Sequence, residues 1–240
     1  MLPDTGVFRY DTSDMRGYVL GTRSHNTGLV DGLPQNRRQK YVKIKPHEMH
    51  NLSDLVAKIG EETEVADGIY NEGYGPELVS ATHRRRVVFF KNGLAESKPF
   101  FLVIDRYSAE EEHTFETSFQ LTTAPITVEG HNIIATYKTG ATLTMVSSAY
   151  PTVTVGQFTP EFMGWRPDHT PEAKVHFPAP IVAYKSTGTE AYIATVLYPA
   201  PDSSECPIIS VSADKDGFSV TVNGVVEYFS YCDELVNPAK

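Results

Sequence analysis

The sequence is short of cysteine and contains no long apolar run. Its 240 residues include two cysteines, Cys206 and Cys232, which are too few for a disulfide framework and leave a pair and two free thiols equally open. No run approaches the roughly 18 apolar residues of a membrane-spanning helix. The opening residues, MLPD, lack the basic and apolar regions of a secretory signal peptide, so export would require a signal that this sequence does not include. We expect a soluble globular protein with no membrane partner.

Basic charge is also scarce. The chain has 21 Lys and Arg against 30 Asp and Glu, a formal net charge of -9. Nucleic acid is therefore not an expected partner, because binding to phosphates needs concentrated basic side chains. Two local basic runs, residues 36–40 and 84–86, are interpreted as solvated faces or as charged strand edges.

Alternating polar and apolar residues, β-branched residues and turn signals dominate the chain and predict an all-β fold. The expected strands are residues 17–21, 27–30, 40–45, 85–91, 100–106, 113–121, 133–139, 142–147, 152–155, 175–177, 181–185, 192–198, 208–213, 218–222 and 225–231. One window, 52–62, has helical spacing, and residues 161–180 are expected to form a long loop. Asp216-Gly217 and Asn223-Gly224 predict tight hairpin turns, because these residue types tolerate positive φ.

Regular strands and turns of this kind fit a large antiparallel β-sandwich. We expect either one domain over residues 1–240 or a sandwich followed by a small β meander from about residue 200. Acidic residues 110–112 are expected to form a solvated turn between two strands.

An ordered set of short motifs resembles the β-domain of heparinase II/III-like polysaccharide lyases. The motifs near the start are Asp4-x-Gly6, Tyr10-Asp11, Arg16-x-Tyr18, Thr22, His25-Asn26-Thr27 and Asp31-Gly32-x-x-Gln35. Farther on they are Gly68-x-Tyr70-x-x-Gly73-Tyr74, Thr82-His83-x-Arg85-x-Val87, Phe100-Phe101-Leu102-Val103-Ile104-Asp105-Arg106, Gly164-Trp165, Ala179-Pro180 and Thr195-Val196-Leu197-Tyr198-Pro199. The last 40 or so residues are the least distinctive.

This resemblance implies a supersandwich-like β-domain that normally follows an (α/α) toroid. Uronic-acid polysaccharides such as glycosaminoglycans or alginate would bind between the two parts, in a periplasmic or secreted enzyme. The toroid is not in this sequence, and neither are the family's helix-borne Tyr and the Asn or His that act around the scissile bond. We therefore expect this chain alone to be inactive, with its catalytic residues unknown. An alternative is a non-catalytic carbohydrate-binding or scaffold module.

The resemblance also implies a zinc site. It assigns Asp4 and His25 as two of three ligands, the third coming from a His-Gly-His stretch that is absent here. Two ligands alone bind zinc weakly, so a site in this chain would be incomplete. Two other roles remain open for His25: it could simply hydrogen-bond a neighbouring strand, or it could act directly in catalysis. His47 and His50 have a spacing that also suits a metal, but no third partner is near them in the sequence.

Elimination at a uronic acid needs a group that neutralises the carboxylate, a base for the C5 proton and an acid for the leaving oxygen. Five residues are predicted to bind substrate: Arg16, Tyr18, Asn26, Gln35 and Trp165. Trp165 suits stacking on a sugar, although a lone tryptophan also suits a core or loop anchor. His83 is interpreted as a strand-edge histidine. A sandwich without its toroid would expose apolar surface, so self-association is plausible.

Overall fold

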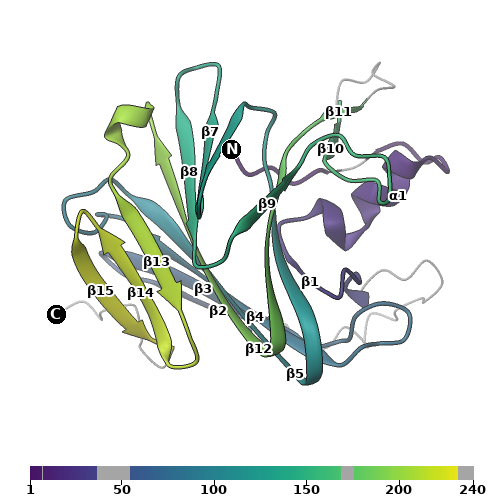
Figure 1. Cartoon of the computed structure of the whole chain (residues 1–240), viewed down its shortest axis with the longest axis horizontal. Coiled ribbons are helices and arrows are strands. Elements are labelled where there is room, and N and C mark those ends of the chain that lie inside the picture. Colours follow the sequence, from purple (N-terminus) through teal and green to yellow (C-terminus); the bar gives the residue numbers. More distant parts are fainter. Residues whose placement is uncertain (7, 37–54, 169–175, 232–240) are drawn as a thin grey trace.

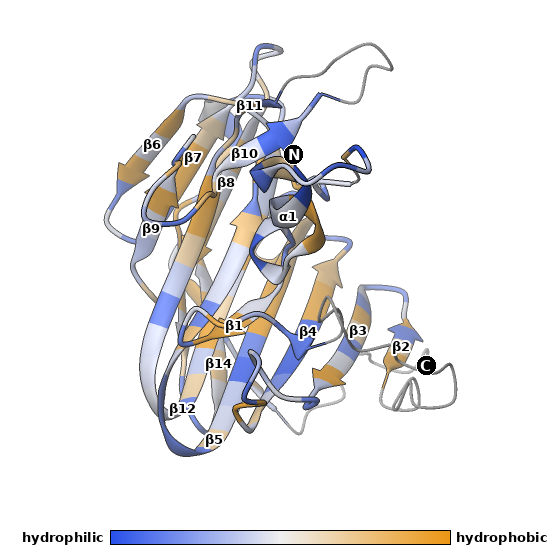
Figure 2. Cartoon of the chain, turned by 90° about the vertical axis from the view of Figure 1, so that its right-hand side faces the viewer, coloured by the Kyte–Doolittle hydropathy of each residue, from blue (hydrophilic) through white to orange (hydrophobic). Residues whose placement is uncertain are grey.

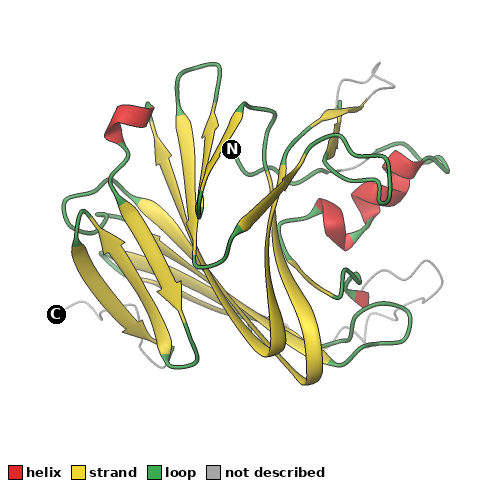
Figure 3. Ribbon diagram, in the orientation of Figure 1, coloured by secondary structure: helices red, strands yellow, loops and turns green. Residues whose placement is uncertain are grey.

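The computed structural model of the chain describes residues 1–6, 8–36, 55–168 and 176–231. Strands dominate it, with few helical turns (Figure 3). In chain order the elements are α1 (Asp14–Leu20), η1 (Thr22–Ser24), β1 (Gly28–Val30), β2 (Val56–Ile59), β3 (Thr63–Tyr70), β4 (Ala81–Phe90), β5 (Phe100–Gln120), β6 (Ile126–Glu129), β7 (Asn132–Thr136), β8 (Thr142–Ser147), β9 (Pro151–Thr154), β10 (Trp165–Pro167), β11 (His176–Pro178), β12 (Ile181–Ala200), η5 (Ser203–Glu205), β13 (Ile209–Ala213), β14 (Gly217–Val222) and β15 (Val225–Ser230). In the described ranges, no helix has the length and apolar character needed to cross a membrane. The all-β expectation is confirmed.

The largest sheet is built around two long antiparallel strands, β5 and β12, of 21 and 20 residues. Its main order is β2-β3-β4-β5-β12-β8-β7-β6, with β1 added to β5 and β9 added to β12 (Figure 1). β4 and β8 flank one half of the central pair, whereas β1 and β9 flank the other half. The central pair thus connects the two halves of the sandwich.

Each of these long strands was expected as two shorter ones. Residues 110–112 stay within β5, so the turn expected there is wrong, although their side chains are exposed as expected. The pairing with β12 shifts between Gly188 and Glu190, which gives the acidic stretch room at the bend without reversing the chain. This bent middle of β5 is blue, and hence hydrophilic, in Figure 2.

The two faces of the central strands contribute to different hydrophobic clusters, because successive side chains of a strand point to opposite faces. Val103 and Tyr107 belong to a first core, which extends to β7, β8 and the early part of β12. Leu102 and Ile104 belong to a second core. The antiparallel sheet β13-β14-β15 covers the second core with Phe218 and other apolar side chains of β14.

The two hairpins of this small sheet were both expected, but only one turn works as predicted. Asn223 and Gly224 have φ of 50° and 84°, as a tight turn of this type requires. Gly217 does not have a positive φ. Instead, Asp214 accepts hydrogen bonds from the backbone N–H groups of Asp216 and Gly217, which holds the β13-β14 turn.

Three local predictions are wrong. Residues 17–21, expected as a strand, lie mostly in α1, where Ser13 caps the first turn and Met15, Tyr18 and Val19 form one buried face. Residues 52–62 have helical spacing, but their described part contains β2, which pairs with β3, a strand that was not expected. The expected loop 161–180 contains β10, which was not expected, and it pairs with β11, which lies close to the expected strand 175–177. The expected strand 40–45 lies outside the described residues.

Candidate functional site

The segment that carries His25 is fixed by the elements before and after it. Arg23 in η1 pairs with Glu116, which is buried on β5, and also with Glu161. The His25 backbone N–H closes η1 by donating to the Thr22 carbonyl at 3.1 Å. β1 then adds to the edge of β5, so the segment is held at both ends.

Asp4 and His25 lie in contact. His25 Nδ1 is 2.8 Å from Asp4 Oδ2, and the other oxygen of Asp4 accepts the Gly6 backbone N–H at 2.7 Å. Both side chains reach solvent, with exposed fractions of 35% for His25 and 62% for Asp4. Partial burial raises the pKa of the Asp4 carboxyl, but the hydrogen bonds from Gly6 and His25 outweigh it and hold the pKa below its usual range. The carboxylate is therefore ionised and available as a ligand near neutral pH.

Asn26 is held from three directions. Its side chain accepts the Gln120 backbone N–H at 2.6 Å and donates to the Pro3 carbonyl at 3.0 Å. Its own carbonyl accepts a hydrogen bond from the Arg85 guanidinium. Asn26 therefore ties the N-terminal segment to β5 and β4, and positions the neighbouring His25.

Asn26 and Gln35 meet at one surface depression of about 310 Å³. Gln35 donates from its side chain to the Thr27 hydroxyl at 3.1 Å, and its backbone N–H donates to the Thr22 hydroxyl at 2.9 Å. The remaining lining residues are Leu55, Ala66, Asp67, Gly68, Ile69, Tyr70, His83, Arg85 and Val87. The depression combines apolar walls with amide and guanidinium groups, a composition that suits a sugar chain.

The other predicted substrate residues lie on or beside α1. The Arg16 guanidinium lies 4.6 Å from the ring of Tyr10, which is 97% exposed, and donates to the Phe8 carbonyl. Tyr18 and Trp165, by contrast, are buried in one cluster with Met15, Val19 and Ile181. Burial raises the pKa of the Tyr18 phenol to about 12, which disfavours its ionisation near neutral pH. Only Arg16 of this group presents a polar end at the surface.

The sequence interpretation missed a buried charged network beneath the depression. His83, expected at a strand edge, is 4% exposed, and its Nε2 lies 2.6 Å from Asp105 Oδ1. Arg85 donates to both oxygens of Asp105, at 2.7 and 3.0 Å. Desolvation raises the pKa of Asp105, but the charge of Arg85 and the hydrogen bond from His83 hold it well below its usual range. Period-two spacing places His83 and Arg85 on one face of β4, which was the available signal.

A glycine lets β1 approach this network closely. A Cβ atom at Gly28 would lie 2.4 Å from the Tyr107 hydroxyl and 2.8 Å from His83 Nδ1. His83 and Tyr107 are themselves stacked, with ring centroids 4.4 Å apart. The network therefore supports the segment of His25 and Asn26 from below.

Comparison with known protein families identifies the family of this chain. The family model described as "Heparinase II/III-like, C-terminal" matches residues 1–212. The chain belongs to the heparinase II/III-like family. A search of curated protein sequences found no match.

Solved structures agree with the fold of this heparinase II/III-like domain. Heparan sulfate lyase HepC from Pedobacter heparinus superposes with a TM-score of 0.68 at 18% identity, covering 100% of this chain and 35% of the HepC chain. A heparinase III structure gives a TM-score of 0.68 at 18% identity, covering 96% of this chain and 33% of that chain. The heparinase II/III-like domain thus spans about a third of the length of these relatives.

The donor types at Asp4 and His25 fit zinc, which takes carboxylate oxygen and imidazole nitrogen at about 2.0–2.2 Å. Across the described parts of the chain, no group of three or more His, Cys, Asp or Glu residues is placed to hold a metal. The pair therefore fits as two ligands of a site that needs further donors. His47 and His50 lie outside the described residues.

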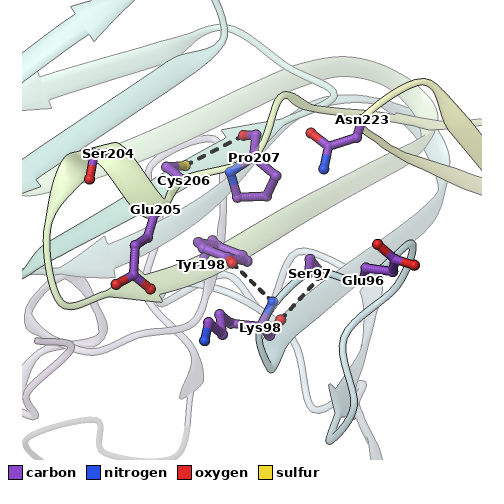
Figure 4. Close-up of a pocket in the computed structure, with 9 residues that line it drawn as sticks. All are labelled: Glu96, Ser97, Lys98, Tyr198, Ser204, Glu205, Cys206, Pro207 and Asn223. Carbon is purple, nitrogen blue, oxygen red and sulfur yellow. Dashed lines mark hydrogen bonds between the residues drawn. The ribbon is translucent and has the colours of Figure 1, made fainter.

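The heparinase II/III-like domain has a second hollow, of about 460 Å³ (Figure 4). It opens between the β4-β5 connection and the segment after β12, on the opposite side of the molecule from α1 (Figure 1). Its residues are Glu96, Ser97, Lys98, Tyr198, Ser204, Glu205, Cys206, Pro207 and Asn223. The Cys206 thiol contacts the Thr144 hydroxyl at 3.2 Å, and Cys232 lies outside the described residues. None of the predicted site residues lines this hollow.

Proposed function

We propose that this chain is the β-sandwich part of a polysaccharide lyase that cleaves uronic-acid polysaccharides by β-elimination. The match of the heparinase II/III-like model to residues 1–212 carries this proposal. The relatives include a heparan sulfate lyase, which favours a glycosaminoglycan as substrate and a periplasmic or extracellular location. The chain would supply one wall of the cleft, and a helical toroid would supply the other.

The wall would be the surface formed by residues 8–36 and the adjacent ends of β3 and β4. Arg16 carries a fixed positive charge at this surface and would pair with a uronic acid carboxylate. Asn26 and Gln35 present amides at the depression. Tyr18 and Trp165 would support this wall by fixing α1, because both are buried. The proton transfers would depend on groups of the helical part.

The elimination assay tests this proposal. The 240-residue chain should release no unsaturated uronides from heparin, heparan sulfate, alginate or chondroitin. A longer protein that contains this chain and a toroid should release them from at least one of these polymers. Release by the chain alone would overturn the proposal that the proton transfers depend on the helical part. Binding without release by the longer protein would favour the alternative, a non-catalytic carbohydrate-binding module.

We further propose that Asp4 and His25 ligate zinc beside the cleft. In a longer protein that contains this chain and supplies the remaining donors, His25→Ala should lower zinc affinity by more than the roughly 10–100-fold typical of losing a residue that merely supports a ligand. Zinc content after equilibrium dialysis, measured by mass spectrometry, checks this expectation. His131→Ala is the matched control, because His131 lies at β7 and contacts the Ser147 carbonyl and Tyr150. Equal zinc loss in both variants, or in neither, would contradict the assignment.

A further inference from the structure

A small enclosed cavity lies on the other face of the sheet from Asn26, where β3, β4 and β5 run side by side. Its volume is about 10 Å³, which is room for one particle of about the size of water. The lining residues are Asp67, Arg84, Arg86, Ile104, Arg106 and Tyr231. Three arginines and one aspartate therefore line a space that has room for a single small occupant.

One carboxylate serves two of these arginines. Arg84 Nε donates to Asp67 Oδ1 and Arg86 Nε donates to Asp67 Oδ2, both at 2.7 Å. Asp67 is 4% exposed, so this pairing occurs away from bulk water. The Arg86 side chain is 17% exposed and that of Arg84 is 40% exposed, which leaves a route to solvent past Arg84. Asp67, Arg84 and Arg86 together carry a net charge of +1.

Arg106 adds a positive charge without a carboxylate. Its guanidinium carbon lies 4.3 Å from the ring centre of Tyr231 and 6.0 Å from that of Tyr192. Within the described residues the Arg106 guanidinium makes no ion pair and no hydrogen bond, although such a group has five N–H donors. The lining thus carries a net charge of +2.

Tyr231 offers a further unused donor. Its hydroxyl is buried and has no hydrogen-bond partner in the part of the chain that the structure describes. Burial raises the pKa of the phenol, so the group stays protonated and keeps its donor. The nearby acidic groups are outside the lining: Glu190 accepts from the Tyr192 hydroxyl, and Asp214 influences Tyr231 electrostatically.

We propose that this cavity binds a small monovalent anion of the halide class, chloride under ordinary conditions. The Arg106 guanidinium is partly buried and has no carboxylate partner among the described residues, and the Tyr231 hydroxyl is a buried donor without an acceptor. An anion would satisfy both groups at once, whereas a water molecule brings no charge. The volume excludes a sulfate or a sugar sulfo group, which needs more space than one water. The site is separate from the proposed cleft and does not depend on the lyase assignment.

Bromide provides the direct test, because it replaces chloride and scatters X-rays anomalously. Crystals of the wild-type chain grown in bromide should show an anomalous peak inside the cavity, in contact with Arg106. A cavity without such a peak overturns the proposal, whatever the behaviour of any variant.

Thermal unfolding supplies a second readout. At constant ionic strength, replacing gluconate by chloride should raise the midpoint of wild-type unfolding until the effect saturates. Arg106→Gln should weaken this chloride effect at least about tenfold, because charged hydrogen bonds are lost. Arg166→Gln on β10, which removes an equal charge far from the cavity, should retain it. Equal chloride dependence in both variants contradicts the site.

Discussion

Asp105→Asn is expected to lower the free energy of unfolding by about 3–5 kcal/mol, the cost of removing one partner from a buried ion pair. Asp105 is fully buried and is the only carboxylate that ion-pairs with Arg85 among the described residues. Asparagine keeps the shape but removes the charge, and its amide sets N–H donors against those of Arg85 and His83. The loss is large against the 5–15 kcal/mol that stabilises a typical domain.

Urea unfolding followed by circular dichroism measures this effect. Asp216→Asn is the control, because Asp216 is 70% exposed and its ion pair with Lys215 is long, at 3.8 Å. Its unfolding free energy should stay within about 0.5 kcal/mol of the wild type. Similar values for the two variants would show that the buried network contributes little to stability.

The pH dependence of stability gives the same network a second signature. The folded-state pKa of Asp105 is lowered, so its contribution is present above the unfolded value of about 3.9 and is lost as pH falls toward the folded value. Burial lowers the pKa of His83, outweighing the attraction of Asp105. Below about pH 6.5, His83 therefore binds a proton in the unfolded chain but stays neutral in the folded chain, which also reduces stability. The difference between the wild type and Asp105→Asn should hold near neutral pH and shrink below about pH 4.

The sequence predicted those parts of the fold that depend on local chemistry. The turn at Asn223-Gly224 needs positive φ, and these two residue types alone predict such a turn. α1 was missed because Tyr18 and Leu20 alternate with smaller residues, as in a strand. Its cap at Ser13 and its face of Met15, Tyr18 and Val19 are equally visible, but the choice between the two periods depends on packing against Ile181 far along the chain.

The candidate site was predictable where a motif records it and not where strand register creates it. Asp4 and His25 follow from the family motif, and the structure places them in contact. Arg85 and Asp105 are direct cross-strand partners on β4 and β5, 20 residues apart. Without that register, residues 84–86 have the composition of a solvated basic run. The prediction that they are solvated is wrong for Arg85 and Arg86, which pair with buried carboxylates.

Phe218→Ala is expected to lower the free energy of unfolding of the whole domain by about 3–5 kcal/mol. Phe218 is 1% exposed and lies in the second core, which also contains Phe100 and Tyr198 of the long central strands. Its ring also stacks on Phe229 of β15, with centroids 5.1 Å apart. Because this core is shared by β13–β15 and the large sheet, we expect both to unfold in one transition.

Trp165 makes this expectation testable at a distance. It is the only tryptophan, and it lies beside α1, at the opposite end of the molecule from β14 (Figure 1). Phe218→Ala should therefore shift the midpoint of Trp165 fluorescence together with that of circular dichroism. Val226→Ala on the same small sheet should shift neither, because Val226 is 62% exposed. If the Trp165 midpoint stays at its wild-type value while circular dichroism splits into two steps, the segment from about residue 200 is a separate folding unit, and the second core is not what joins it to the sandwich.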